Sequence, residues 1–183
     1  MILVFGDSLS AGYGLPQGRG WVDLLQNKLD AEKFDYRVVN ASISGETTLG
    51  GRNRLPAALK QHRPDVVVLE LGSNDGLRGQ PLEAMRDNLV AMIQASRRAG
   101  SRVLVVGMRI PPNYGPDYTR KFHATFETVA RLERAALVPF LLDGFAEKRE
   151  LFQEDGIHPN QQAQARMLDS VWKALRPMLR PGS

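Results

Sequence analysis

The chain contains no cysteine among its 183 residues. This absence excludes disulfide bonds, a thiolate nucleophile and any metal site built on cysteine. It leaves the redox compartment open, because a protein without thiols suits oxidising and reducing surroundings alike. Histidine is scarce as well: His62, His123 and His158 are the three present, and no two of them have the spacing of metal ligands. We therefore expect no zinc site and no cofactor.

Long apolar runs and dense basic tracts are also missing. No segment approaches the roughly 20 consecutive apolar residues of a membrane span, so we expect no stable membrane insertion. The net charge of +4 comes from scattered arginines, and without a basic cluster we expect no nucleic-acid partner. Nothing resembles a coiled-coil seam, and we expect a monomer.

The start of the chain lacks the pattern of a signal peptide, because Met1 leads straight into an apolar segment. We expect a mature periplasmic or secreted form whose export signal was replaced by a start methionine. A cytoplasmic protein is the alternative.

Short apolar segments alternate with longer amphipathic ones along the whole chain. Val66–Leu69 and Val103–Val106 are continuously apolar, which is typical of parallel strands covered on both faces. The alternation predicts an α/β fold, a doubly wound parallel sheet with helices on both faces. Strands are expected at 2–6, 36–40, 65–71, 102–108 and 137–142, and helices at 21–31, 55–61, 82–99, 118–134 and 160–179. A single domain is expected over residues 1–179, followed by a tail at 180–183.

Three residues carry the groups of a Ser-His-Asp hydrolase. Ser8 follows the apolar segment Ile2–Phe5, so it is expected at the carboxyl end of a buried strand, where open α/β sheets place their chemistry. A serine hydroxyl needs a neighbouring base for attack at neutral pH, and His158 is the candidate. Asp155 lies three residues before His158, close enough for its carboxylate to fix the imidazole tautomer.

Two of these three assignments have an alternative. Ser8 could instead cap a helix, as serine often does between a strand and a helix. Asp143 and Glu154 are rivals of Asp155 for the orienting carboxylate. Pro159 suits the first turn of a helix, which would hold His158 at a helix entrance. His62 and His123 are expected to be structural or exposed, with His123 on the surface or on the wall of a groove.

Four short motifs carry a family resemblance. They read Gly6-Asp7-Ser8-Leu9-Ser10, Val39-Asn40-Ala41-Ser42-Ile43-Ser44-Gly45, Leu71-Gly72-Ser73-Asn74-Asp75 and Asp155-Gly156-Ile157-His158-Pro159. In this order they resemble the motif blocks of the GDSL, or SGNH, hydrolases. Further segments, 12–14, 76–79 and 112–115, look like the bacterial thioesterase I, lysophospholipase and arylesterase branch. Ser73 departs from that branch, which usually has glycine there.

The resemblance implies a fold and a set of roles. The fold is a flavodoxin-like three-layer α-β-α sandwich with a five-stranded parallel sheet in the order 2-1-3-4-5. The oxyanion hole is implied to consist of the backbone N–H groups of Ser8 and Gly45 and the side-chain amide of Asn74. Gly45 could instead be a simple turn glycine, and Asn74 could cap its loop.

Several other polar residues follow the strands. Asp7, Asp75 and Asn40 are expected to brace loops at the sheet edge by hydrogen bonds. Glu70 lies in an otherwise apolar strand and needs a buried partner, which the sequence does not identify. Gly76–Gly79 is flanked by glycines and is expected to form a mobile lid.

An acyl pocket is expected along the loop edges. Its candidate apolar side chains are Leu9, Leu77, Ile110, Pro111 and Ile157. The resemblance implies hydrolysis of small-molecule esters and thioesters, including acyl-CoA, aryl esters and lysophospholipids, through an acyl-enzyme intermediate. A carbohydrate O-deacetylase and a catalytically silent lipid- or glycan-binding module are the alternatives.

Overall fold

The computed structural model describes residues 1–182 and is built around one parallel sheet. Its strands are β1 (Ile2–Gly6), β2 (Val38–Asn40), β3 (Val66–Glu70), β4 (Arg102–Val106) and β5 (Ala136–Val138). All neighbours pair in parallel, and the strand order is β2-β1-β3-β4-β5. The predicted α/β class and strand order are confirmed.

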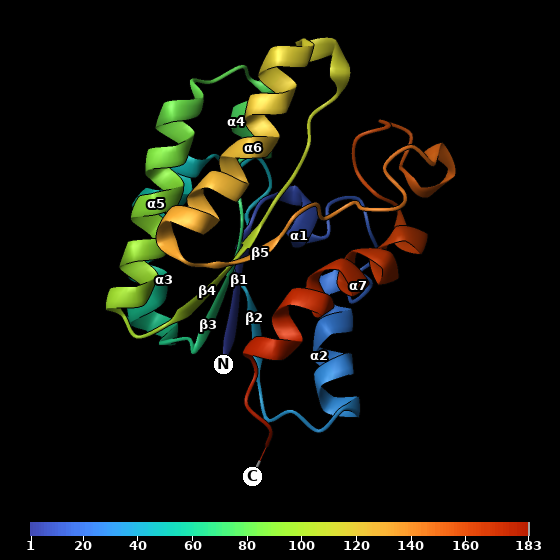
Figure 1. Cartoon of the computed structure of the whole chain (residues 1–183). Helices are drawn as coiled ribbons and strands as arrows, with labels where there is room; N and C mark the ends of the chain where they lie inside the picture. The colour runs from blue at the N-terminus through green and yellow to red at the C-terminus, as the bar shows by residue number, and fades with distance from the viewer. Residues whose placement is uncertain (183) are drawn as a thin grey trace.

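Helices cover both faces of the sheet and complete a three-layer sandwich (Figure 1). One layer contains α3 (Thr48–His62), α5 (Leu82–Arg98) and α6 (Pro116–Glu133). The other contains α2 (Trp21–Ala31) and α7 (Gln164–Leu175). Two short helices, α1 (Ser8–Ala11) and α4 (Ser73–Leu77), follow β1 and β3 directly at the carboxyl edge of the sheet. This edge is where the loops that carry the motifs meet.

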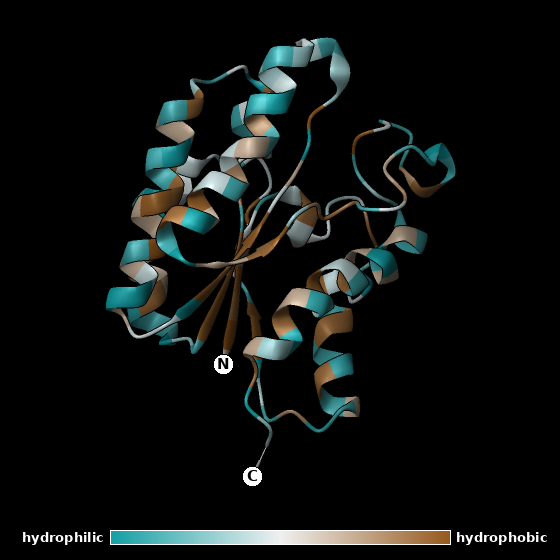
Figure 2. Cartoon of the chain, viewed as in Figure 1, coloured by the Kyte–Doolittle hydropathy of each residue, from teal (hydrophilic) through white to brown (hydrophobic). Residues whose placement is uncertain are grey.

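The hydropathy pattern accounts for this arrangement. Every residue of β1 and β3 is buried, and the central strands form an apolar layer in Figure 2. The helices turn polar faces outward and apolar faces to the sheet, as their periodicity predicts. No helix within residues 1–182 is long and apolar enough to cross a membrane.

Two predicted element boundaries are wrong for identifiable reasons. The strand expected at 137–142 ends at Val138, because Pro139 has no N–H to extend the ladder. The helix expected from Leu55 begins at Thr48, where the Thr47 hydroxyl accepts a hydrogen bond from the Gly50 N–H at 3.2 Å. Its glycines suggested a loop, but a Cβ at Gly51 would lie only 2.4 Å from the Leu71 side chain. Close packing, and not a turn, explains glycine there.

The end of the chain also differs from the expectation. The expected helix at 160–179 is α7 with a 3-10 turn at each end, Gln161–Ala163 and Arg176–Met178. Pro159 lies outside the first helical turn and forms a β-bridge with Phe152, while the Asn160 side chain caps the turn by accepting from the Gln162 N–H at 3.0 Å. In the predicted tail, the Arg180 N–H donates to the Tyr36 hydroxyl at 3.2 Å, and residue 183 lies outside the described residues. The division at residue 179 stays a prediction.

Candidate active site

The nucleophile candidate Ser8 is the first residue of α1, immediately beyond β1. The cap of α1 is Asp7, whose carboxylate accepts a hydrogen bond from the Leu9 N–H at 3.0 Å. The alternative of Ser8 as a cap is therefore wrong. Its hydroxyl is free to point out of the sheet edge, where the helix start holds it in a fixed position.

Ser8, His158 and Asp155 form one continuous chain of hydrogen bonds. The Ser8 Oγ lies 2.8 Å from the His158 Nε2, and the His158 Nδ1 lies 2.6 Å from the Asp155 Oδ2. The second carboxylate oxygen of Asp155 accepts from the backbone N–H groups of Ile157, at 2.9 Å, and of His158, at 3.0 Å. With Nδ1 donating to Asp155, Nε2 is left as the acceptor that can take the Ser8 proton.

The environment of Asp155 keeps its carboxyl ionised. Partial burial raises its pKa, but hydrogen bonds from the His158 N–H, the His158 ring and the Ile157 N–H outweigh burial, so the pKa lies below the ordinary value. Neither of the two rivals, Asp143 and Glu154, has a hydrogen bond to His158 among residues 1–182, whereas the Asp155 Oδ2 lies 2.6 Å from its Nδ1. The structure thus brings Asp155, and not its rivals, to the imidazole.

Contacts between the two ends of the chain hold the histidine loop against β1. The Gln153 side-chain amide donates to the backbone oxygens of Tyr13, at 2.8 Å, and Pro159, at 3.1 Å. The Tyr13 ring packs on the His158 ring with centroids 4.5 Å apart. Gly14 fits beside Gln153 because it has no side chain, since a Cβ there would lie 2.0 Å from the Gln153 Oε1. These contacts explain how Ser8 and His158, 150 positions apart, become neighbours.

The three oxyanion-hole candidates lie at the carboxyl edge of the sheet, Ser8 at the start of α1, Asn74 in α4 and Gly45 in the turn after β2. The Asn74 side-chain amide donates to the Glu46 carbonyl oxygen at 3.0 Å and approaches the Asp7 Oδ2 at 3.5 Å. Gly45 has a φ of 83°, a left-handed conformation that favours glycine, and it is exposed. Among the residues that the structure describes, the N–H groups of Ser8 and Gly45 have no hydrogen-bond acceptor. They are available to a developing oxyanion.

Two buried carboxyl groups, Asp7 and Glu70, lie beneath the nucleophile, each 1% exposed. Glu70 finds the partner that the sequence left unidentified: it accepts from the Ser10 hydroxyl at 2.7 Å, and its carboxyl lies beside that of Asp7. Burial raises the pKa of Asp7 to about 6, against the lowering effect of its hydrogen bonds and of His158. Burial, and then the Asp7 charge, raise the pKa of Glu70 well above its usual range.

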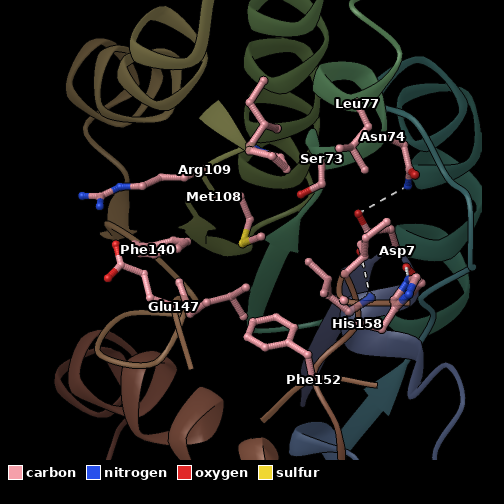
Figure 3. Close-up of a pocket in the computed structure, with 18 of the residues that line it drawn as sticks. Asp7, Ser73, Asn74, Leu77, Met108, Arg109, Phe140, Glu147, Phe152 and His158 are labelled. Atoms are coloured by element: carbon pink, nitrogen blue, oxygen red, sulfur yellow. Dashed lines mark hydrogen bonds between the residues drawn. The ribbon is translucent and has the colours of Figure 1, made fainter. Parts of the chain in front are cut away.

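A pocket of about 480 Å³ opens beside Ser8 and His158 (Figure 3). All five side chains predicted to line an acyl pocket lie on its wall: Leu9, Leu77, Ile110, Pro111 and Ile157. Their contact with a substrate stays a prediction. The sequence interpretation missed other apolar wall residues, namely Met108, Phe140, Leu142 and Phe152. Pro139 was the available signal, because it ends β5 and turns Phe140 and Leu142 from strand residues into loop residues at the sheet edge.

The remaining predicted residues have structural contacts. Asp75 accepts from the Thr48 N–H at 2.9 Å and the Thr48 hydroxyl at 2.6 Å, and Asn40 donates to the Ser10 carbonyl oxygen at 2.8 Å, so both brace loops as predicted. The His123 Nδ1 lies 3.1 Å from the Met108 carbonyl oxygen, behind the pocket wall. His62 ends α3, away from the site.

The segment Gly76–Gly79, expected to form a mobile lid, is divided between two kinds of structure: Gly76 and Leu77 belong to α4, and Arg78 and Gly79 form an exposed turn after it. Gly76 is a buried residue of α4, and a Cβ there would lie 2.5 Å from the Phe122 ring. The Tyr114 hydroxyl donates to the Leu77 carbonyl oxygen at 2.9 Å. These contacts hold the first half of the segment against α6 and the loop before it, and a lid movement of the exposed second half stays a prediction.

Comparison with known proteins agrees with this geometry. Residues 4–166 match the model of the GDSL-like lipase/acylhydrolase family. Esterase TesA of Pseudomonas aeruginosa is 51% identical over 97% of this chain and 89% of its own length. An arylesterase of Vibrio mimicus is 42% identical over 95% and 87%. The thioesterase 1/protease 1/lysophospholipase L1 of Escherichia coli K12 is 40% identical over 97% and 84%.

Solved structures give the same result. The crystal structure of TesA superposes with a TM-score of 0.95, at 50% identity over 97% of this chain and 99% of that one. The psychrotrophic esterase EstA of Pseudoalteromonas sp., inhibited by monoethylphosphonate, superposes with a TM-score of 0.92, at 44% identity over 97% of both chains.

Proposed function

Because this chain belongs to the GDSL-like lipase/acylhydrolase family, we propose that Ser8, His158 and Asp155 are its catalytic triad and that it hydrolyses carboxylic esters and thioesters. The observation that carries the proposal is the unbroken hydrogen-bond chain, 2.8 Å from Ser8 to His158 and 2.6 Å from His158 to Asp155. These are distances at which a base can take the proton of an attacking hydroxyl.

In the first half of the reaction, the Ser8 Oγ attacks the carbonyl carbon while the His158 Nε2 takes its proton. The carbonyl oxygen becomes an oxyanion, which the N–H groups of Ser8 and Gly45 and the Asn74 amide stabilise. The tetrahedral intermediate then collapses, the bond to the leaving oxygen or sulfur breaks, and His158 gives the proton to the leaving group. An ester between the acyl group and Ser8 remains.

The second half repeats these steps with water. His158 takes a proton from the water as its oxygen attacks the acyl-enzyme, and the proton passes to the Ser8 Oγ as the carboxylic acid leaves. Asp155 stays ionised throughout and stabilises the imidazolium that forms twice in the cycle.

The pocket supports a substrate with an acyl chain longer than acetyl. Its volume of about 480 Å³ and its wall of Met108, Phe140, Leu142 and Phe152 would bury several methylene groups. We therefore favour aryl esters, acyl thioesters and lysophospholipids, in line with the names of the relatives, over the carbohydrate O-deacetylase alternative. A silent binding module has no need of the complete proton-transfer chain.

The proposal extends to assembly and location. We propose a monomer, because one chain supplies all three triad residues and the three oxyanion donors. We propose action in the periplasm or outside the cell, a location that the absence of cysteine neither favours nor excludes. Light scattering of the purified protein and fractionation of the native cells test these two statements.

A phosphonate probe and two variants test the catalytic proposal. An alkyl phosphonate should label Ser8 covalently, as mass spectrometry of the peptides would show, and Ser8→Ala and His158→Ala should abolish turnover of a nitrophenyl ester. Ser170→Ala, in the remote helix α7, is the control and should retain labelling and turnover. Near-normal turnover in Ser8→Ala, with the fold intact by circular dichroism, would refute the triad.

A further inference from the structure

Ser73 carries a buried hydroxyl without a partner. Its side-chain Oγ is one of the buried polar atoms in residues 1–182 that have no hydrogen-bond partner, and the residue is 8% exposed. The other two such atoms, on Trp21 and Arg54, belong to side chains that do not line the pocket. Buried hydroxyls in folded proteins nearly always have a partner, so a free one at a binding site needs an explanation.

The position of Ser73 connects this hydroxyl to the substrate. Ser73 lies on the pocket wall, next in sequence to Asn74. In Figure 3 its oxygen is directed toward the cavity, between Asp7 on the catalytic side and Met108 on the apolar side, but neighbouring atoms cover it, so a substrate oxygen would reach it after a small rotation of the Ser73 side chain or its neighbours. An acyl chain that runs from the oxyanion hole to the apolar wall would pass Ser73 within its first few carbons, because Ser73 and the oxyanion candidate Asn74 line the same pocket.

The chemistry of the hydroxyl selects a kind of acyl group. A plain alkyl chain would cover the Ser73 Oγ and leave it unpaired, whereas an oxygen on the chain would pair with it as donor or acceptor. We propose that Ser73 is a specificity-determining residue that hydrogen-bonds a hydroxyl group at C2 or C3 of the acyl chain, so that 2- or 3-hydroxyacyl esters and thioesters are favoured substrates. This inference rests on the proposed function and refines its substrate class.

The test compares matched substrates. S-hexanoyl-N-acetylcysteamine is measured beside its 2-hydroxy and 3-hydroxy analogues, each as both enantiomers. The quantity of interest is the ratio of kcat/KM for a hydroxyacyl substrate to kcat/KM for the plain one. In Ser73→Ala this ratio should fall about fivefold for at least one analogue, which at RT of 0.59 kcal/mol corresponds to about 1 kcal/mol, a typical net hydrogen bond.

Two further variants separate hydrogen bonding from shape and from stability. Ser73→Gly lacks the hydroxyl, as Ser73→Ala does, but has a smaller side-chain volume. If the hydroxyl and not the volume matters, the ratio of kcat/KM values should fall in both variants. Ser101→Ala removes another buried hydroxyl, one that donates to the Pro64 carbonyl oxygen at 2.6 Å outside the pocket, and should leave the ratio unchanged. The melting temperature of Ser101→Ala should drop because a buried hydrogen bond is lost, whereas that of Ser73→Ala should stay level or rise.

The outcomes are distinguishable. A fall of about threefold or more in both Ser73 variants supports the inference, and a smaller change, or a change in only one of them, overturns it. If the parent protein fails to hydrolyse any of the thioesters or a nitrophenyl ester, the proposed function itself is wrong. Hydrolysis of all substrates with equal ratios in parent and variants refutes the Ser73 role alone.

Discussion

Replacing Asp7 by asparagine should stabilise the protein, and the gain should depend on pH. Asp7 is 1% exposed, and burial raises its pKa from 3.8 to about 6. In the unfolded chain the carboxyl is ionised above about pH 4, but the folded protein holds its proton up to about pH 6. The folded state thus binds more protons in this window, and stability must fall as pH rises through it.

The size of the effect follows from the shift. Moving from 3.8 to about 6 is roughly two pKa units, and each unit corresponds to about 1.4 kcal/mol, so Asp7 alone costs about 3 kcal/mol of stability above pH 6. Asparagine keeps an oxygen that can accept from the Leu9 N–H but has no charge to bury. Removing the Asp7 charge also relieves the repulsion that raises the pKa of Glu70. This second effect also makes the variant more stable than the parent.

Urea unfolding followed by tryptophan fluorescence, between pH 4 and pH 8, measures this difference. The free energy of unfolding of Asp7→Asn minus that of the parent should grow by about 3 kcal/mol from pH 4 to pH 6.5 through the titration of Asp7. Asp169→Asn makes the same chemical change on the exposed face of α7 and should give a flat difference. A difference for Asp7→Asn that stays constant across this range would refute the reasoning.

Three further predictions concern the site and the helix beside it. Asn74→Ala should lower kcat by a factor on the order of 10²–10³ with little change in KM, because one oxyanion donor is lost. Stopped-flow and steady-state kinetics measure this loss, and a kcat equal to that of the parent would show that Asn74 does not have this role. Asp155→Asn should lower kcat about 10⁴-fold, because the amide cannot fix the imidazole tautomer or stabilise the imidazolium. The matching change at the neighbouring residue, Glu154→Gln, should keep near-normal rates. A loss of only tenfold in Asp155→Asn would point to another orienting group. Gly76→Ala should lower the free energy of unfolding by about 1–3 kcal/mol in urea titrations, because its Cβ would lie 2.5 Å from the Phe122 ring, and an unchanged urea midpoint would contradict this packing.

The pattern of the chain was enough to predict the layers of the fold. Continuous apolar segments such as Val66–Leu69 and helical periodicity between them are local properties, and they determined the α/β class and most element positions. Boundaries were less predictable where packing overrides local preference. The glycines at the start of α3 resemble a loop in sequence, but Gly51 lies inside the helix, and it is glycine because the Leu71 side chain leaves no room for a Cβ.

The candidate triad could also be proposed from sequence, because its chemistry requires particular side chains. Ser8 was identifiable by its place after an apolar strand, and Asp155 by its distance of three residues from His158. The pairing of Asp7 with Glu70 was not identifiable. Asp7 follows β1 directly, and Glu70 ends the adjacent strand β3. Nothing in either local segment indicates that the two carboxyl groups lie side by side.

What the amino-acid sequence determined by itself is therefore the set of candidate reacting groups and the order of the layers, both of which depend on residue type and local spacing. Tertiary structure alone decided that the Ser8 hydroxyl meets a ring nitrogen 150 positions away, that Phe140 and Phe152 face the same cavity, and that the Ser73 hydroxyl is left without a partner. These features depend on which loops the parallel sheet gathers at its carboxyl edge, a long-range contact that no local segment encodes.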